Sequence, residues 1–217
     1  FLYNYLTHIS IISDTGYALG GDSSRYIVGA EQTIKGNLFN YPKNIQMPTV
    51  AEGDTNNAYG YLGYIFFLSF FMYFNLGLMG AVICQILVSG VAGYCLYRIG
   101  YNIWNRNTGI LSLVIFLFYF PLQQWCFYIL TESLFVNFGI IGLYFLTSKK
   151  NVWKLFIGLT ILVYTISLRP FGIVLVPTIV FYFYLIIRKK NNFLYYSYLF
   201  LMIIISIVVI TLSNRYF

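Results

Sequence analysis

Apolar runs of about the length that crosses a bilayer follow one another along this chain, and they constrain its fold more than any other feature. A helix needs about 20 apolar residues to span the hydrocarbon core. Soluble domains carry about 25% charged residues, whereas this chain carries 9% among 217 residues. We therefore expect an all-α polytopic transmembrane helix bundle in a cell membrane. The candidate runs are 78–97, 108–121, 126–147, 153–168, 171–187 and 193–212.

The chain begins at Phe1, inside another apolar stretch. Residues 1–12 resemble the end of a first span, and the sequence ends at Phe217 just after an apolar run. We interpret 1–217 as a single transmembrane domain that is a fragment of a longer protein.

Basic residues beside the runs predict the orientation of the bundle. Three short loops hold eight of the 13 Lys and Arg residues and no acidic residue. Such loops usually face the cytoplasm, and two runs separate each loop from the next, so all three fit one side. The net charge of +7 is thus an orientation signal and does not indicate nucleic-acid binding. The eight residues are Arg98, Arg106, Lys149, Lys150, Lys154, Arg188, Lys189 and Lys190.

The polar stretch near the start carries the opposite charge. Residues 13–58 hold five of the six acidic residues, so we place them outside. The aromatic run 59–74 then cannot span the bilayer, and it must lie in or dip into the outer interface. Residues 13–76 would thus form one external loop. The 16 residues of the run 59–74 reach only about 24 Å as a helix, and Tyr and Phe favour interfaces. The alternative is an ordinary short span, which would place 13–58 in the cytoplasm.

A short helix on the membrane surface is predicted over residues 23–36. Asp22 precedes it as an N-cap, and Gly36 ends it. Four residues would share one face at helical spacing: Tyr26, Ile27, Ala30 and Ile34.

Glu132 is the only acidic residue within an apolar run. A carboxylate there costs about 2.5–3.5 kcal/mol near the helix centre and usually marks function. A structural ion pair is the alternative. Arg169, in the sequence ISLRPFG, suits phosphate binding or anchoring at the interface. Asp22 is either a general base at the membrane surface or a plain helix cap.

Metal and cofactor sites have little support in the sequence. Cys84, Cys95 and Cys126 form no CxxC pair or Cys/His cluster, so we interpret them as packing residues. His8 is interpreted as a tolerated polar residue of the first span. No cofactor is expected with certainty, although a carboxylate pair on the outer face would suit a divalent metal.

Five motifs follow one another along the chain: Gly21 through Tyr26 with the surface helix to Lys35-Gly36, the aromatic segment Tyr59–Tyr64, Tyr97-Arg98 before Trp104, Thr131-Glu132-Ser133-Leu134, and Arg169-Pro170. Their order resembles that in the GT-C superfamily of membrane glycosyltransferases. The chain looks most like the bacterial branch related to protein O-mannosyltransferases and lipid A aminoarabinose transferases. It departs from the pattern at Ser23, where many members have a second acid, and in the aromatic segment, which lacks proline.

The resemblance implies an enzyme that transfers a sugar from a polyprenyl-phosphate donor to an acceptor hydroxyl on the extracytoplasmic face, with inversion. The acceptor would be a glycan, a lipid or a protein, and membrane lipids would surround the enzyme. Asp22 would be the catalytic base, Glu132 a second acid lining the cavity, and Arg169 the ligand of the donor phosphate. Arg25, Tyr26 and Tyr61 would bind substrate.

Three alternatives stay open. A transporter or flippase would show inverted repeats and polar residues at the bilayer midplane. Another polyprenyl-linked glycan polymerase or ligase would keep key residues in later external loops. A non-catalytic relative would use Asp22 only as a cap.

Overall fold

The protein is all-helical in a computed structural model that describes residues 17–20, 22–36, 61–147, 152–169, 172 and 175. Among these residues the only extended pairing is an isolated parallel bridge between Ala18 and Tyr128. The all-α prediction is therefore confirmed for the described part. The elements are α2 (Ser23–Ile34), α3 (Leu62–Tyr73), α4 (Gly77–Ile103), α5 (Arg106–Phe118), α6 (Phe120–Gln124), the 3₁₀ helix η2 (Trp125–Phe127), α7 (Thr131–Thr147) and α8 (Val152–Leu168).

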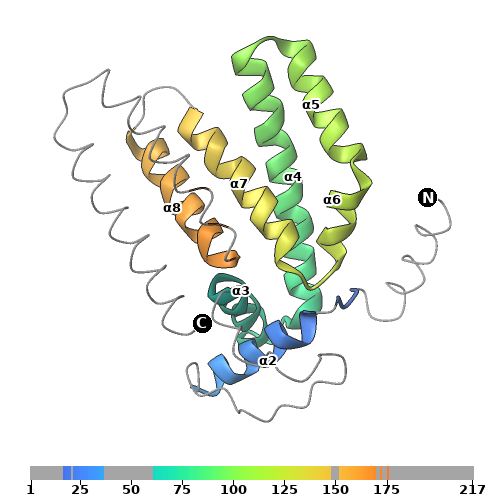
Figure 1. The fold of residues 1–217 in the computed structure, drawn as a ribbon, viewed down its shortest axis with the longest axis vertical. Helices are drawn as coiled ribbons and strands as arrows, with labels where there is room; N and C mark the ends of the chain where they lie inside the picture. Colours follow the sequence, from blue (N-terminus) through green and yellow to red (C-terminus); the bar gives the residue numbers. More distant parts are fainter. Residues whose placement is uncertain are drawn as a thin grey trace.

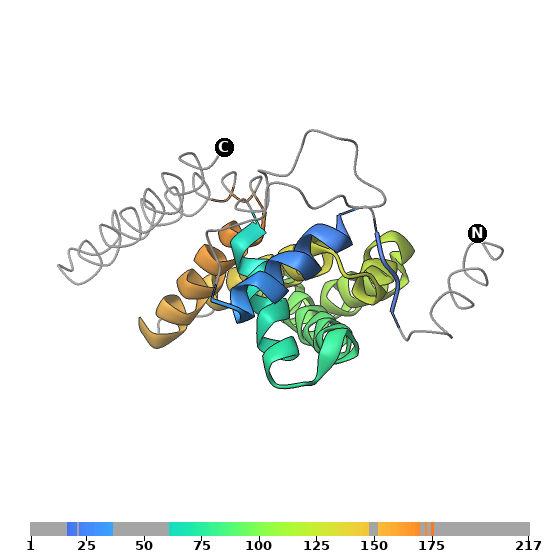
Figure 2. The same cartoon turned by 90° about the horizontal axis from the view of Figure 1, so that it is seen from below.

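Helices α4, α5, α7 and α8 run side by side, whereas α2 and α3 lie across one end of them (Figures 1 and 2). The turn between α4 and α5, the end of α7 and the start of α8 lie at the opposite end (Figure 1). Arg106 and Lys154 belong to that opposite end by their positions in α5 and α8. The grouping matches the sequence-based assignment of these loops to one face. Lys149, Lys150 and the 188–190 cluster lie outside the described residues.

Helix α4 is the one described helix that is long and apolar enough to cross a membrane. Its 27 residues extend about 40 Å, more than the predicted run 78–97 required. Helices α5 and α6–η2 pass the same test together, as a pair bent by 58°. Helices α3, α7 and α8 are apolar but shorter. The described residues thus contain one or two such helices, and the polytopic arrangement remains a prediction.

The bend between α5 and α6 follows from the sequence around Pro121. Proline is tolerated in the first turn of a helix but not in its interior, so α5 ends at Phe118 and a new helix begins at Phe120. The Gln123 amide donates to the Phe116 carbonyl at 2.8 Å, and the Ser89 hydroxyl donates to Gln123 at 3.2 Å. The Gln123 side chain therefore satisfies a backbone carbonyl near the break, and Ser89 of α4 helps to hold that side chain in place.

The predicted span 126–147 is wrong at its start, because α7 begins at Thr131. The preceding backbone is bonded elsewhere. The Ala18 N–H donates to Phe127 O at 2.8 Å, and the Ile129 N–H donates to Ala18 O at 3.0 Å. Glu132 consequently lies in the first helical turn of α7 instead of in the interior of a helix that starts at residue 126.

The helix predicted over residues 23–36 is confirmed as α2, which ends at Ile34 and is followed by Gly36 with a φ of 77°. Its position on a membrane surface stays a prediction. Its buried face differs from the prediction. Ser23, Tyr26, Gly29 and Ala30 are buried, whereas the Ile34 side chain is exposed. The buried face therefore begins at the helix N-terminus, which places that end of α2 in the protein interior.

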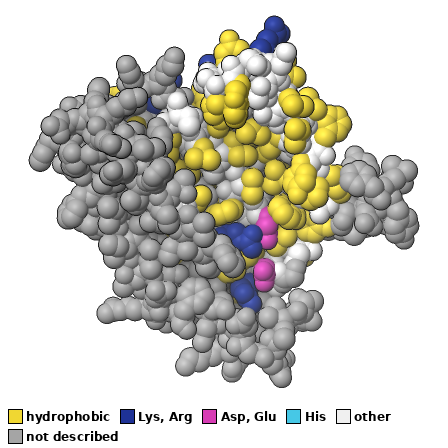
Figure 3. Space-filling view, turned by 45° about the horizontal axis from the view of Figure 1, so that its top comes forward, with side chains coloured by type: hydrophobic (Ala, Val, Ile, Leu, Met, Phe, Trp, Pro, Cys, Tyr) yellow, Lys and Arg dark blue, Asp and Glu magenta, His cyan; other side chains and the backbone are white. Residues whose placement is uncertain are grey.

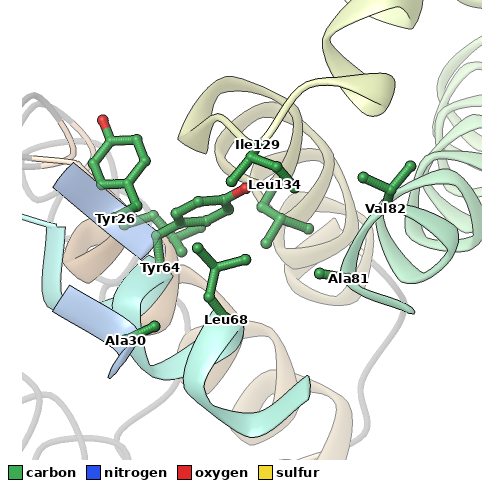
Figure 4. Packing of buried hydrophobic residues seen from close by; sticks show 9 residues of the cluster. Tyr26, Ala30, Tyr64, Leu68, Ala81, Val82, Ile129 and Leu134 are labelled. Carbon is green, nitrogen blue, oxygen red and sulfur yellow. The ribbon is translucent and has the colours of Figure 1, made fainter. Parts of the chain in front are cut away.

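The core at this end joins α2 and α3 to α4 and α7. Tyr64 and Leu68 of α3 are fully buried, and each such side chain stabilises the packed state by about 1.5–3 kcal/mol. Figure 4 shows Tyr64 reaching from α3 toward Ile129 and Leu134. At 12 residues, α3 extends about 18 Å. This is short for a span of about 30 Å, which fits the predicted interfacial position of 59–74 without testing it.

The predicted runs 1–12, 171–187 and 193–212 lie outside the described residues, apart from Gly172 and Leu175. The acidic residues Asp14, Glu52 and Asp54 and the only histidine, His8, also lie outside them.

Candidate active site

The N-terminus of α2 is fixed against a segment more than 100 residues further along the chain. The buried Ser23 hydroxyl donates to the Ile129 carbonyl at 2.8 Å and accepts the Gly20 N–H at 2.7 Å. Together with the Ala18 bridge, these bonds set the start of α2 beside the start of α7. Asp22 and Glu132 are thereby brought to the same end of the bundle.

Asp22 occupies the N-cap position of α2, but its side chain makes no capping hydrogen bond. Its side chain is 49% exposed, and it pairs with Arg25, at 3.8 Å between Oδ1 and Nη1. Asp22 therefore occupies the predicted N-cap position, but the capping hydrogen bond expected there is not made. A half-exposed carboxylate that is not committed to the helix terminus can accept a proton from an incoming hydroxyl.

Glu132 and Arg169 form an ion pair, with 3.2 Å between Oε1 and Nη1. Their side chains are 22% and 28% exposed, so a ligand can reach them. Glu132 lies in the first turn of α7, where the helix dipole favours a negative charge. The sequence left a structural ion pair and a functional acid as alternatives for Glu132. The geometry shows the ion pair and identifies Arg169 as its partner.

Tyr26 lies between these two ion pairs. Burial raises its pKa well above the usual value for tyrosine, and the negative charges of Asp22 and Glu132 raise it further. Its side chain is hydrogen-bonded to Thr131. Tyr26 is therefore a neutral, buried hydroxyl that connects α2 to the first turn of α7.

Aromatic rings pack closely around Tyr26. The ring of Tyr61 lies 5.1 Å away and the ring of Tyr64 lies 5.2 Å away, centre to centre, both tilted relative to it. Edge and tilted contacts of this kind add about 0.5–1.5 kcal/mol beyond area burial. Tyr61 is only partly buried, so it is the ring of this group that a ligand can contact.

All six predicted site residues therefore belong to one connected group: Asp22, Arg25, Tyr26, Tyr61, Glu132 and Arg169. Figure 3 shows acidic and basic side chains gathered below a broad hydrophobic surface, with further basic side chains at the far end. The arrangement offers an exposed carboxylate for proton transfer and a guanidinium for an anion. Among the described residues no group of three or more His, Cys, Asp and Glu could hold a metal ion.

Gln85 is a contributor that sequence reasoning missed. It is fully buried on α4, and its amide accepts the Tyr64 hydroxyl at 2.9 Å and donates to Cys126 O and Tyr128 O, each at 3.0 Å. It thereby ties α3 and the segment before α7 to α4. The sequence does carry a signal for it, because Gln85 is the only amide side chain in the run 78–97.

The three cysteines are free thiols, and Cys95 and Cys126 are buried, which agrees with their interpretation as packing residues. Comparison with known proteins adds no assignment. No family model, curated protein or solved structure matches the chain.

Proposed function

We propose that this chain is part of a membrane glycosyltransferase that uses a polyprenyl-phosphate-linked sugar as donor. The observation that carries the proposal is the placement of a half-exposed carboxylate, Asp22, at the same end of the bundle as the Glu132–Arg169 ion pair. Tyr26 connects the two through its interactions with Asp22, Glu132 and Thr131. The order of sequence motifs that resembles GT-C enzymes supports the same reaction.

In this reaction the oxygen of the acceptor hydroxyl attacks the anomeric carbon of the donor, and Asp22 accepts the proton of that hydroxyl. The bond between that carbon and the phosphate oxygen breaks, and the configuration inverts. Negative charge develops on the departing polyprenyl phosphate. The guanidinium of Arg169 stabilises that charge, as preorganised donors do in transition states.

The setting that we propose is a cell membrane with the reaction on its extracytoplasmic face. A prenyl chain is insoluble in water, so an enzyme that uses it gains from a lipid-facing scaffold. Helices α4 and α5 supply large exposed apolar side chains, among them Leu87, Val91, Leu111 and Phe118. The acceptor is a glycan, a lipid or a protein with a free hydroxyl.

Replacement of Asp22 by Asn in the full-length protein tests the base assignment. Sugar transfer from polyprenyl-phosphate donors should fall about 10²–10⁴-fold, because a general base contributes about that much. Glu31→Gln is the matched control, since it removes a carboxylate from the same helix about two and a half turns away and should retain activity. Transfer by D22N at the rate of the wild type would overturn the assignment.

A transporter remains the alternative from another class. Transporters carry polar residues near the bilayer midplane, and Gln85, which is buried within α4, is the residue that most resembles such a group. Its amide is already bound by a hydroxyl and two carbonyls. A side chain so engaged ties helices together and does not line a path. The described residues therefore favour the transferase.

A further inference from the structure

Arg169 can serve an anionic ligand only if its long side chain is held in place. Its backbone is fixed on both sides. Leu168 is fully buried, and the Arg169 carbonyl accepts the Gly172 N–H at 2.9 Å. The side chain itself is long and has many rotamers, so holding it in one position costs entropy.

Glu132 supplies that restraint, and it is itself restrained. Its Oε1 faces Arg169 at 3.2 Å, while its Oε2 accepts the Thr131 hydroxyl at 3.3 Å. Thr131 is fully buried and also bonded to Tyr26. The two oxygens thus have separate partners, and the carboxylate is held from α7 and, through Tyr26, from α2.

The guanidinium is only partly used in this arrangement. An arginine side chain has five N–H donors, and the Glu132 contact is made through Nη1. The Arg169 side chain is 28% exposed, so its outer N–H groups can reach a second anion while Glu132 keeps its own contact.

We propose that Glu132 is a positioning residue, which holds the Arg169 guanidinium ready for the phosphate of a prenyl-phosphate ligand. This inference rests on the proposed function. In this role Glu132 transfers no proton and binds no metal. Glu132 raises the affinity for the ligand, because a preordered Arg169 side chain loses less freedom when the ligand binds.

The experiment measures binding of a soluble C15 prenyl monophosphate to the full-length protein in detergent, by calorimetry. Glu132→Gln should weaken binding about three- to tenfold, the usual effect of leaving one long side chain to be ordered by the ligand. Arg169→Lys should weaken it more, because lysine cannot form a planar bidentate contact. The double variant should bind no more weakly than Arg169→Lys alone, since Glu132 then has no guanidinium to hold.

Each outcome is decisive. Wild-type affinity in E132Q, tighter binding in E132Q, or independent addition of the two effects would overturn the positioning role while leaving the donor class intact. Failure of the wild-type protein to bind prenyl phosphate would overturn the donor class and this inference with it. Melting temperatures measured without ligand separate the effect on affinity from general destabilisation, and Glu31→Gln serves again as the control.

Discussion

At the scale of single residues, Tyr26 shows how burial and charge act together. Its ring is packed by Tyr61 and Tyr64, and its hydroxyl is bonded to Thr131 beside two carboxylates. Ionisation of the Tyr26 hydroxyl would create a buried negative charge close to the two existing carboxylates. The folded protein therefore holds the Tyr26 proton more tightly than the unfolded chain does.

This predicts a specific loss of stability in alkaline solution. The pKa of Tyr26 is raised in the folded state, whereas an unfolded tyrosine titrates near pH 10. Above about pH 10 the unfolded chain loses this proton first, so the stability contributed by Tyr26 is complete below that pH and declines above it.

Between pH 9 and 11 the free energy of unfolding should decrease with pH less steeply in Tyr26→Phe than in the wild type. The slopes should differ by up to about 1.4 kcal/mol per pH unit. At pH 7 the variant should lose about 1 kcal/mol, because the Thr131 hydrogen bond is gone. Thermal unfolding at a series of pH values checks both effects. Parallel curves for the two proteins would show that Tyr26 is not the titrating group.

The charged residues of the site were predictable because charge is so scarce in this sequence. Asp22, Glu132 and Arg169 stood out in a chain with 19 charged residues, 13 basic and 6 acidic. The pairing of Glu132 with Arg169 was not predictable, since it depends on where α8 ends in space. Gln85 was missed because an amide carries no charge, although it binds three partners.

At the scale of helices, glycine sets how closely α4 and α5 approach. A Cβ atom added at Gly109 of α5 would lie 2.7 Å from the Tyr97 carbonyl oxygen on α4. That oxygen belongs to the backbone and cannot rotate away. The two helices would have to separate.

Gly109→Ala should therefore destabilise the protein by about 1–3 kcal/mol, the usual cost of overpacking. Gly90→Ala on α4 is the matched control, because a Cβ atom there has nothing within 4 Å. Alanine at that position should be neutral or stabilise the helix by about 0.5–1 kcal/mol. The melting temperatures of both variants, measured in the same detergent, test this prediction. Equal changes in melting temperature would contradict a close contact at Gly109.

Helix positions followed from the apolar runs, but helix ends did not. Apolar side chains mark 126–130 as part of a span, yet backbone bonds to Ala18 and side-chain bonds from Gln85 keep this segment out of α7. Those partners lie about 40 and 110 residues away in sequence. Local patterns cannot report bonds of that range.

At the scale of the whole molecule, the described helices have two chemically different ends. One end carries α2, α3 and the candidate site, and the other carries the turn between α4 and α5 (Figure 1). The distribution of basic residues predicted this separation from sequence. The assignment of the second end to the cytoplasm stays a prediction from the positive-inside rule.

Impermeant thiol labelling of intact cells tests the orientation. In a protein whose three native cysteines are replaced, Lys35→Cys at the C-terminal end of α2 should be labelled from outside. Asn107→Cys beside the α4–α5 turn should be labelled only after the cells are permeabilised. Both positions are exposed, so access across the membrane is the variable, and the reverse pattern would refute the orientation.

The bond between Ser23 and Ile129 joins residues 106 positions apart, and it has a consequence for biosynthesis. Ribosomes add about 5–20 residues per second, so roughly 5–20 s pass between the synthesis of the two partners. During that interval α2 lacks the anchor that sets its N-terminus beside Glu132. The N-terminus of α2 therefore has no docking site until α4, α5 and the segment that follows them have been made.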